Sequence, residues 1–245
     1  MYGSVLLFES KRVFRNFPTV FFGLAFPVMM LLIFGGIYGN DPADQFGGQG
    51  TIDVSVPAYV GIVLAVTGLM SFPIGMVEYR SRSFLRRLRA TPARPTAFLT
   101  GQIIGNGVVC VLGVVLLIAT GMIGYDLSSP EHPWAFAGLV ILAALSMFGI
   151  GLLIASIARS ESTALVLANL IYFPMIFLTG ATIPLEIMPD TMQDIANVLP
   201  LTYAIDALKW AWLDTGGDAM TTSLLVTGGT IVVCGAVSLK WFRWE

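Results

Sequence analysis

Six long apolar stretches constrain this chain more than any other feature of its sequence. None of them carries Asp, Glu, Lys, Arg or His near its middle. About 20 apolar residues in a helix cross the roughly 30 Å of hydrocarbon in a bilayer. The chain is 56% hydrophobic and 11% charged, whereas a soluble domain has about 25% charged residues. We therefore predict an all-α polytopic membrane protein with spans at 18–39, 54–77, 101–124, 134–158, 162–179 and 219–239.

The distribution of charge predicts how these spans are oriented. Twelve of the 13 basic residues fall on one side of a six-span arrangement, and Lys209 is the exception. Acidic residues gather on the other side, including Asp41, Asp53, Asp126 and the stretch 186–218. Since Lys and Arg are enriched in cytoplasmic loops, both termini are expected in the cytoplasm, with the chain crossing the cell (inner or plasma) membrane.

Six of the basic residues lie in the segment 77–100, between the second and third spans: Arg80, Arg82, Arg86, Arg87, Arg89 and Arg94. On a helical wheel, Val77, Phe84, Leu85 and Leu88 share one face, and most of the arginines take the opposite one. Thr91-Pro92 is expected to end this helix. Its apolar face must lie either in the lipid headgroup region, with the arginines reaching anionic lipid, or in a groove of a cytoplasmic protein.

Two further parts of the chain are helical but do not fit a span. Residues 1–17 predict an interfacial helix, with Leu6, Val13 and Phe14 on the face opposite Lys11 and Arg12. No cleavable signal peptide is expected there. Residues 189–199 and 201–213 have helical periodicity, but each piece is under about 20 Å long and too short to cross. The pair either re-enters the membrane from outside or lies on its outer surface.

The composition of the spans excludes several functions. Ion-coupled transporters need intramembrane charges, and intramembrane proteases need a catalytic dyad or acid pair. No phosphate-binding Gly-rich loop and no metal-ligand cluster occur, Cys110 and Cys234 lie in spans, and the single histidine, His132, is expected to be a solvated loop residue. Energy for uphill transport must therefore come from another subunit.

Polar side chains inside the spans mark a candidate cavity for a hydrophobic or amphiphilic cargo: Thr67, Asn106, Asn169 and Tyr172. The alternative for each of them is an ordinary hydrogen bond between helices. Gly101, Gly105 and Gly107 would allow another helix to approach the third span closely, although this spacing is common by chance in such spans.

Three motifs give the chain its resemblance to a known family. They are FLRRLRATP at 84–92, preceded by Glu78-Tyr79-Arg80; LTGATIPLE at 178–186, followed by Met188-Pro189; and NVLPLTYAIDAL at 197–208. Over essentially its full length the chain resembles the membrane subunits of type-2 ABC (ABC-2) exporters of the daunorubicin-resistance kind. It departs from them at Arg80, where the family often has a second acid.

The resemblance implies an elbow helix, six spans, a cytoplasmic coupling helix in 78–94, and paired re-entrant helices in 180–218. It implies a dimer of permeases, as a homodimer or with a similar permease, each seated on a separate ATP-binding subunit that holds ATP and Mg²⁺. This chain itself would hold no cofactor or metal and would have no ATPase site. The residues expected to dock the ATPase are Glu78, Arg80, Phe84, Leu85, Arg86, Arg87, Leu88 and Arg89. Secondary contacts are expected from Lys11, Arg12, Arg15, Arg159 and Glu161. The expected extracellular gate comprises Gly180, Pro184, Pro189, Pro200 and Tyr203.

The preferred function is thus the membrane half of an ATP-driven exporter of a drug-like or antibiotic-like amphiphile, working by alternating access. Two alternatives remain: the same machine with a lipid or lipid-linked glycan as cargo, and a non-transporting membrane scaffold. The scaffold would have no nucleotide-hydrolysing partner.

Overall fold

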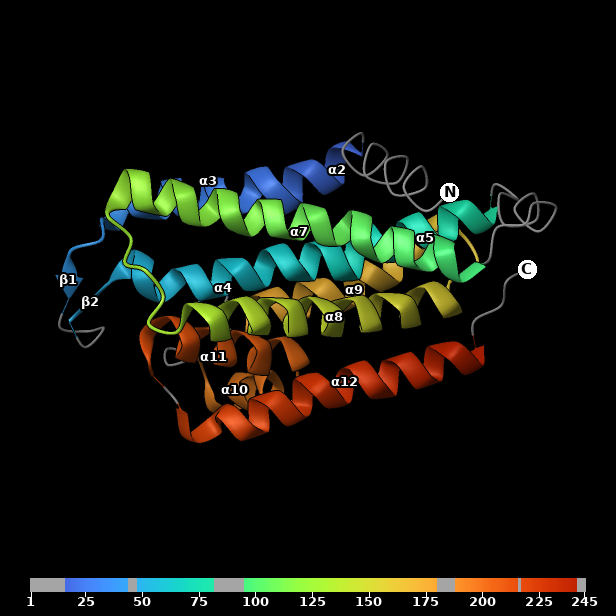
Figure 1. Cartoon of the computed structure of the whole chain (residues 1–245). Helices are drawn as coiled ribbons and strands as arrows, with labels where there is room; N and C mark the ends of the chain where they lie inside the picture. Colours follow the sequence, from blue (N-terminus) through green and yellow to red (C-terminus); the bar gives the residue numbers. More distant parts are fainter. Residues whose placement is uncertain (1–15, 44–47, 82–94, 180–187, 216, 242–245) are drawn as a thin grey trace.

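The computed structural model, which describes residues 16–43, 48–81, 95–179, 188–215 and 217–241, is a bundle of long helices lying side by side (Figure 1). Within these described ranges, six helical stretches are long and apolar enough to cross a membrane. This confirms the predicted all-α membrane fold. The first stretch comprises α2 (Phe17–Val20), the π-helix η1 (Phe21–Ala25) and α3 (Phe26–Tyr38). The second comprises α4 (Thr51–Ala65), the π-helix η3 (Val66–Ser71) and α5 (Phe72–Ser81). The others are α7 (Pro95–Tyr125), α8 (Pro133–Ile157), α9 (Glu161–Leu178) and α12 (Met220–Trp241).

The second span is the centre of the bundle. In the most apolar stretch of this span 83% of the residues are buried, compared with 17% to 50% in the corresponding stretches of the other five spans. Helices α3, α7, α8 and α11 (Pro200–Leu213) all contact α4. A helix that is apolar all round can be surrounded in this way, and the run from Val56 to Leu69 supplies such a surface.

Two helices extend beyond the spans expected from the sequence. The helix of the second span continues to Ser81, past the expected end at Val77, and the helix of the third begins at Pro95, although its apolar stretch begins at Thr100, next to the expected Gly101. Val77 is 1% exposed and belongs to the core, so its assignment to the apolar face of the basic segment was wrong. The reason is packing: an apolar residue at the last turn of a span fits a neighbouring helix as well as a cytoplasmic groove.

The remaining described elements are short. Two-residue strands β1 (Pro42–Ala43) and β2 (Gln49–Gly50) pair antiparallel between the first and second spans. After α9 come α10 (Asp190–Ala196), α11, and the 3₁₀ turn η5 (Gly217–Ala219). Helix α11 is not a surface helix, because Leu201, Ile205 and Leu208 are fully buried and it packs against α4, α8 and α12.

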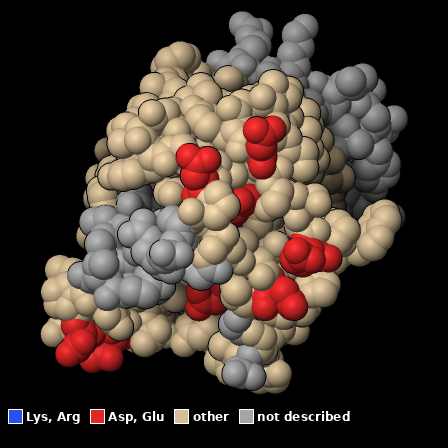
Figure 2. Space-filling view, turned by 90° about the vertical axis from the view of Figure 1, so that its left-hand side faces the viewer, with Lys and Arg blue, Asp and Glu red and all other residues tan. Residues whose placement is uncertain are grey.

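The two ends of the bundle differ in charge. Figure 2 views the end where β1 and β2 lie, and the charged residues visible among those it describes are all acidic. The last residues of α5, α8 and α12 lie at the opposite end (Figure 1), and the described basic residues in or directly after these helix ends are Arg80, Arg159 and Lys240. The fold therefore keeps the predicted acidic and basic sides apart, and the acidic end is called the outer end below.

Candidate functional site

A chain of hydrogen-bonded polar side chains crosses three spans inside the bundle. The Ser71 hydroxyl donates to Asn106 Oδ1 at 2.9 Å, and the Thr19 and Ser71 hydroxyls lie 2.8 Å apart. Because the single Ser71 proton goes to Asn106, the Thr19 hydroxyl donates to Ser71. Asn106 Nδ2 in turn donates to the Gln102 carbonyl oxygen at 2.9 Å. Thr19, Gln102 and Asn106 are each at most 3% exposed, so this polar chain is internally satisfied.

Both π-helices of the bundle lie beside this polar chain. Ser71 is the last residue of η3, and η1 directly follows the helix that carries Thr19. A Cβ placed on Gly23 of η1 would be 3.6 Å from Thr67 Oγ1 of η3, so the two segments are in contact. A π turn has an extra residue in the helical ladder and is frequent at functional sites. The π turns of spans one and two therefore mark this level of the bundle as a candidate functional region.

Removing the Ser71 hydroxyl should test whether this polar chain holds the spans together. We expect Ser71→Ala to lower the free energy of unfolding by about 1 kcal/mol, the range measured for hydrogen bonds between membrane helices. Ser55→Ala is the matched control, since the Ser55 hydroxyl bonds the Thr51 carbonyl of its own helix. Thermal unfolding in mild detergent, followed by labelling of the buried Cys110 thiol, measures both. Equal melting temperatures for the two variants would contradict the assignment.

The predicted cavity residues are only partly brought together. Thr67 and Asn106 lie in or beside the polar chain, but the Thr67 hydroxyl donates to Val63 of its own helix at 2.7 Å. Asn169 donates to the Leu165 carbonyl of α9, and Tyr172 on the same helix is buried. Of the predicted set, Asn106 and Thr67 therefore make hydrogen bonds between helices, Thr67 with the Cys110 thiol of α7, and Asn169 bonds within its own helix.

At the inner end, α5 is joined to the turn between α8 and α9. The Arg80 guanidinium donates to the carbonyl oxygen of Ala158, the C-cap of α8. Positive charge is favoured at a helix C-terminus, where carbonyls lack partners. Two residues on, Ser160 caps α9 by accepting the Thr163 N–H at 3.1 Å. The neighbouring Arg159 and Glu161 are exposed.

Most of the predicted ATPase-docking residues lie outside the described residues, and so do the basic residues of the interfacial helix. Glu78 and Arg80 are described, and both belong to the last turn of α5. The predictions that lie outside concern Phe84, Leu85, Arg86, Arg87, Leu88, Arg89, Lys11, Arg12 and Arg15. Arg80 thus has a structural partner within the chain as well as its expected docking role.

At the outer end, α11 reaches deep into the bundle. A Cβ on Gly61 would lie 2.7 Å from Ile205 and 3.7 Å from Leu201, so the start of α11 is level with Gly61. Gly61 is ten residues after Thr51, the first residue of α4. At 1.5 Å per residue this is about 15 Å below the outer end of α4, roughly half the thickness of the hydrocarbon core.

The predicted gate residues frame the two short helices. Pro189 is the N-cap of α10, and Pro200 is the first residue of α11, where a proline without an N–H is tolerated. The Tyr203 hydroxyl donates to the Asn197 carbonyl at 2.7 Å, across the connection between the two helices. Gly180 and Pro184 lie outside the described residues.

Sequence reasoning missed one cluster entirely, a collar that ties together the outer ends of the first three spans. Asn40 Oδ1 accepts the N–H groups of Ile52 and Asp53 at 3.0 and 3.2 Å, and Asn40 Nδ2 donates to the Tyr125 carbonyl at 3.2 Å. Asp53 Oδ1 also accepts the Ser128 N–H at 2.9 Å. An Asn before a span looks like any loop residue, so no signal in the sequence indicated these contacts.

The fold and these contacts define the class of protein: a multi-pass helical membrane protein with a buried polar core and, on its acidic side, a short buried helix α11 preceded by the mostly exposed α10. No cluster of His, Cys, Asp or Glu suited to a metal ion occurs in the described part of the chain.

The chain belongs to the ABC-2 type transporter family, which its residues 2–213 match. It is similar to the transport permease YvfS of Bacillus subtilis, with 30% identity over 89% of this chain and 87% of the relative. It is also similar to the doxorubicin resistance ABC transporter permease DrrC of Mycobacterium tuberculosis, with 24% identity over 90% and 80%. A third relative, the multidrug ABC transporter permease YbhR of Escherichia coli K12, is 22% identical over 77% and 51%. The chain is thus a membrane permease subunit of an ABC transporter.

Proposed function

We propose that this permease exports a hydrophobic or amphiphilic compound, driven by ATP hydrolysis on a separate cytoplasmic subunit that holds ATP and Mg²⁺. The observation that carries the proposal is the family match over residues 2–213, a range that includes the basic amphipathic segment. ABC-2 permeases work with a cytoplasmic ATP-binding subunit. The drug-related names of two relatives and the uncharged middles of the spans favour an amphiphilic cargo over an ion.

The geometry of α11 supports an outer gate. A short helix that starts about 15 Å below the outer end of α4 is the arrangement expected of a re-entrant helix, and its buried face lies on the central span. In the proposed cycle, two permeases, identical or similar, pair in the cell membrane with their termini in the cytoplasm. Movement of α10 and α11 would then open the cavity outward, and separation of the spans at the Thr19–Ser71–Asn106 chain would open it inward.

The contact between Arg80 and Ala158 supports a route for the driving force. The proposed coupling helix follows α5 directly, and Arg80 fixes the end of α5 to the C-terminus of α8. A tilt of the coupling helix when the ATPase pair closes would therefore be passed to the second, fourth and fifth spans together.

Co-purification tests this function. Tagged permease would be isolated from its native membrane in mild detergent, its bound chains identified by mass spectrometry, and ATP hydrolysis assayed. We expect a stoichiometric ABC ATP-binding subunit, lost in the double variant Phe84→Glu/Leu88→Glu, because charges on the apolar face prevent its burial in the ATPase groove.

A matched double variant places the same charges at the outer end, Thr191→Glu/Asn197→Glu, on residues exposed in or just after α10. It should insert and retain the ATPase. Correct insertion without any ATPase in the wild-type protein would overturn the exporter and favour the scaffold. Retention of the ATPase by Phe84→Glu/Leu88→Glu would overturn the coupling-helix assignment alone.

A further inference from the structure

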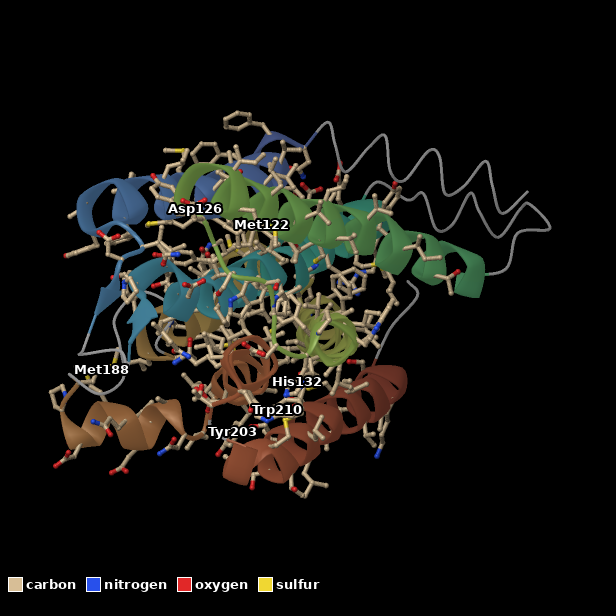
Figure 3. All side chains as sticks on the ribbon, turned by 60° about the vertical axis from the view of Figure 1, so that its left-hand side comes forward. Met122, Asp126, His132, Met188, Tyr203 and Trp210 are labelled. Atoms are coloured by element: carbon tan, nitrogen blue, oxygen red, sulfur yellow. The ribbon has the colours of Figure 1, made fainter. Side chains whose placement is uncertain are left out.

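His132 lies where the outer ends of α8 and α11 meet, although the sequence predicted a solvated loop residue. Its ring stacks on Trp210 of α11, with ring centroids 4.9 Å apart and planes inclined by 24°. Its Nε2 lies 3.1 Å from Asp214 Oδ1. Figure 3 shows the His132 and Trp210 side chains together between the two helices. The side chain of this loop histidine is 43% exposed, and it also contacts Trp210 of α11 and Asp214, the C-cap of that helix.

The backbone around His132 completes the carboxyl end of α11. The His132 N–H donates to the Ala211 carbonyl at 3.0 Å, and the Glu131 N–H donates to Trp212 at 3.3 Å. The last carbonyls of a helix lack partners within it, so the loop before α8 caps α11. His132 is also the N-cap of α8, where its carbonyl accepts the Phe136 N–H at 2.8 Å.

The contact continues one turn inward and is reinforced there by apolar packing. Phe136 of α8 meets Trp212 of α11 edge to face at 5.0 Å between centroids, and both residues are at most 5% exposed. Asp214, which accepts from His132, is held in the left-handed region at φ 55° as the C-cap of α11. The His132 ring, the Asp214 carboxylate and the capping hydrogen bonds therefore attach the carboxyl end of α11 to the amino end of α8.

A second proton on the His132 ring would strengthen this contact between α8 and α11. An ionised carboxylate only accepts hydrogen bonds, so Nε2 carries the proton that faces Asp214, and a second proton on the ring gives it a full positive charge. A histidine changes charge between about pH 5 and 8. The charged ring gains an ion pair with Asp214, a cation–π contact with Trp210 and a favourable position at the negative end of α11.

Some of the other charged groups near the ring favour a positive charge on His132, and others oppose it. Glu131 on the same loop and Asp206 on α11, one turn before Trp210, add negative charge, and Lys209 on α11 adds a positive one. The positive amino end of α8 opposes a charged His132. The His132 and Asp214 side chains are 43% and 64% exposed, which screens their attraction. We therefore expect a change of a few fold, not of orders of magnitude.

We propose that His132 is a positioning residue of the outer gate, and that its protonation strengthens the attachment of α11 to α8 and so slows outward opening at low pH. The attachment is a property of this chain alone. Its effect on transport rests on the proposed function, in which α11 must move.

Hydrogen exchange tests the attachment in the full-length permease in lipid nanodiscs without nucleotide. After correction for intrinsic exchange rates, protection of the amides in 208–215 should be about two- to fivefold greater at pH 5.5 than at pH 8. His132→Gln, which keeps an N–H donor but no charge, should show no such difference, and Asp214→Asn should lose most of it. Glu131→Gln, the neighbouring control, should retain it. A pH difference in His132→Gln equal to that of the wild type would overturn the proposal.

Turnover tests the link to gating, with the permease and its ATP-binding subunit in proteoliposomes. The ratio of turnover at pH 8 to that at pH 5.5 should be at least twofold larger in the wild type than in His132→Gln. If the two proteins had equal turnover ratios while the wild type still showed the pH difference in hydrogen exchange, His132 would attach α11 to α8 without affecting gating. That result would overturn the proposed effect on transport. Failure to find an ATPase at all would sink the proposed function and leave the exchange result standing.

Discussion

A single methyl group added at Gly151 is expected to destabilise the bundle by about 3 kcal/mol or more. A Cβ at this position would lie against the carbonyl oxygen of Gly68, closer than real atoms approach, and 3.2 Å from Phe72. On the facing side, a Cβ on Gly68 would lie 2.5 Å from Met147 Cβ and 2.7 Å from its carbonyl carbon. The obstruction is backbone, which cannot rotate away, so Gly151→Ala forces η3 and α8 apart.

The same helix offers a matched control for this prediction. A Cβ on Gly149 would meet Cys234 Cβ at 3.5 Å, an ordinary van der Waals contact, so Gly149→Ala should be nearly neutral. Thermal unfolding of the purified permease in detergent compares the two, with the yield of folded protein by size-exclusion chromatography as a second readout. A Gly151→Ala protein as stable as Gly149→Ala would show that the central span does not touch α8 at this level.

Replacing Asn40 by alanine is expected to cost about 2 kcal/mol, which for a chain of this size is a fall in melting temperature of several degrees. Asn40 acts as the missing N-cap of α4: Gly50 at that position has no side chain, and Asn40 Oδ1 accepts the N–H groups of the second and third helical residues, Ile52 and Asp53, in its place. The substitution also removes a donor from the Asp53 carboxylate and from the Tyr125 carbonyl. Unmade hydrogen bonds of partly buried groups account for the cost.

Asn169→Ala is the control for Asn40→Ala, because the Asn169 amide bonds only within its own helix in the contacts described above. Hydrogen exchange of residues 51–56 would localise the effect: these amides should exchange faster in Asn40→Ala and be unchanged in Asn169→Ala. Unaltered exchange at the start of α4 would contradict the capping role of Asn40, whatever the change in melting temperature.

Sequence periodicity indicated helices but not their finer geometry. The two π-helices at 21–25 and 66–71 break the 3.6-residue pattern by one residue each, and an apolar run hides such a shift because every neighbour is apolar too. A close approach to the third span was expected at Gly101, Gly105 and Gly107, but a Cβ on Gly107 would meet nothing within 4 Å. Close approaches occur at Gly113 of that span, where a Cβ would lie 2.5 Å from the Gly23 carbonyl oxygen, and between Gly68 and Gly151. The glycine that matters is the one rotated toward a neighbouring helix.

The sequence by itself determined the membrane fold, the six spans, the separation of acidic from basic ends and membership of the ABC-2 family. These properties depend on local hydrophobicity, on the number of charges in each loop and on short motifs. Each of these can be determined from residues that are close together in the sequence. Only the tertiary structure decided which polar groups meet: Ser71 with Thr19 and Asn106, Asn40 with Asp53 and Tyr125, and His132 with Asp214. These partners are 13 to 85 residues apart in the chain, and whether they touch depends on how each helix is rotated and how far it is shifted along its neighbour.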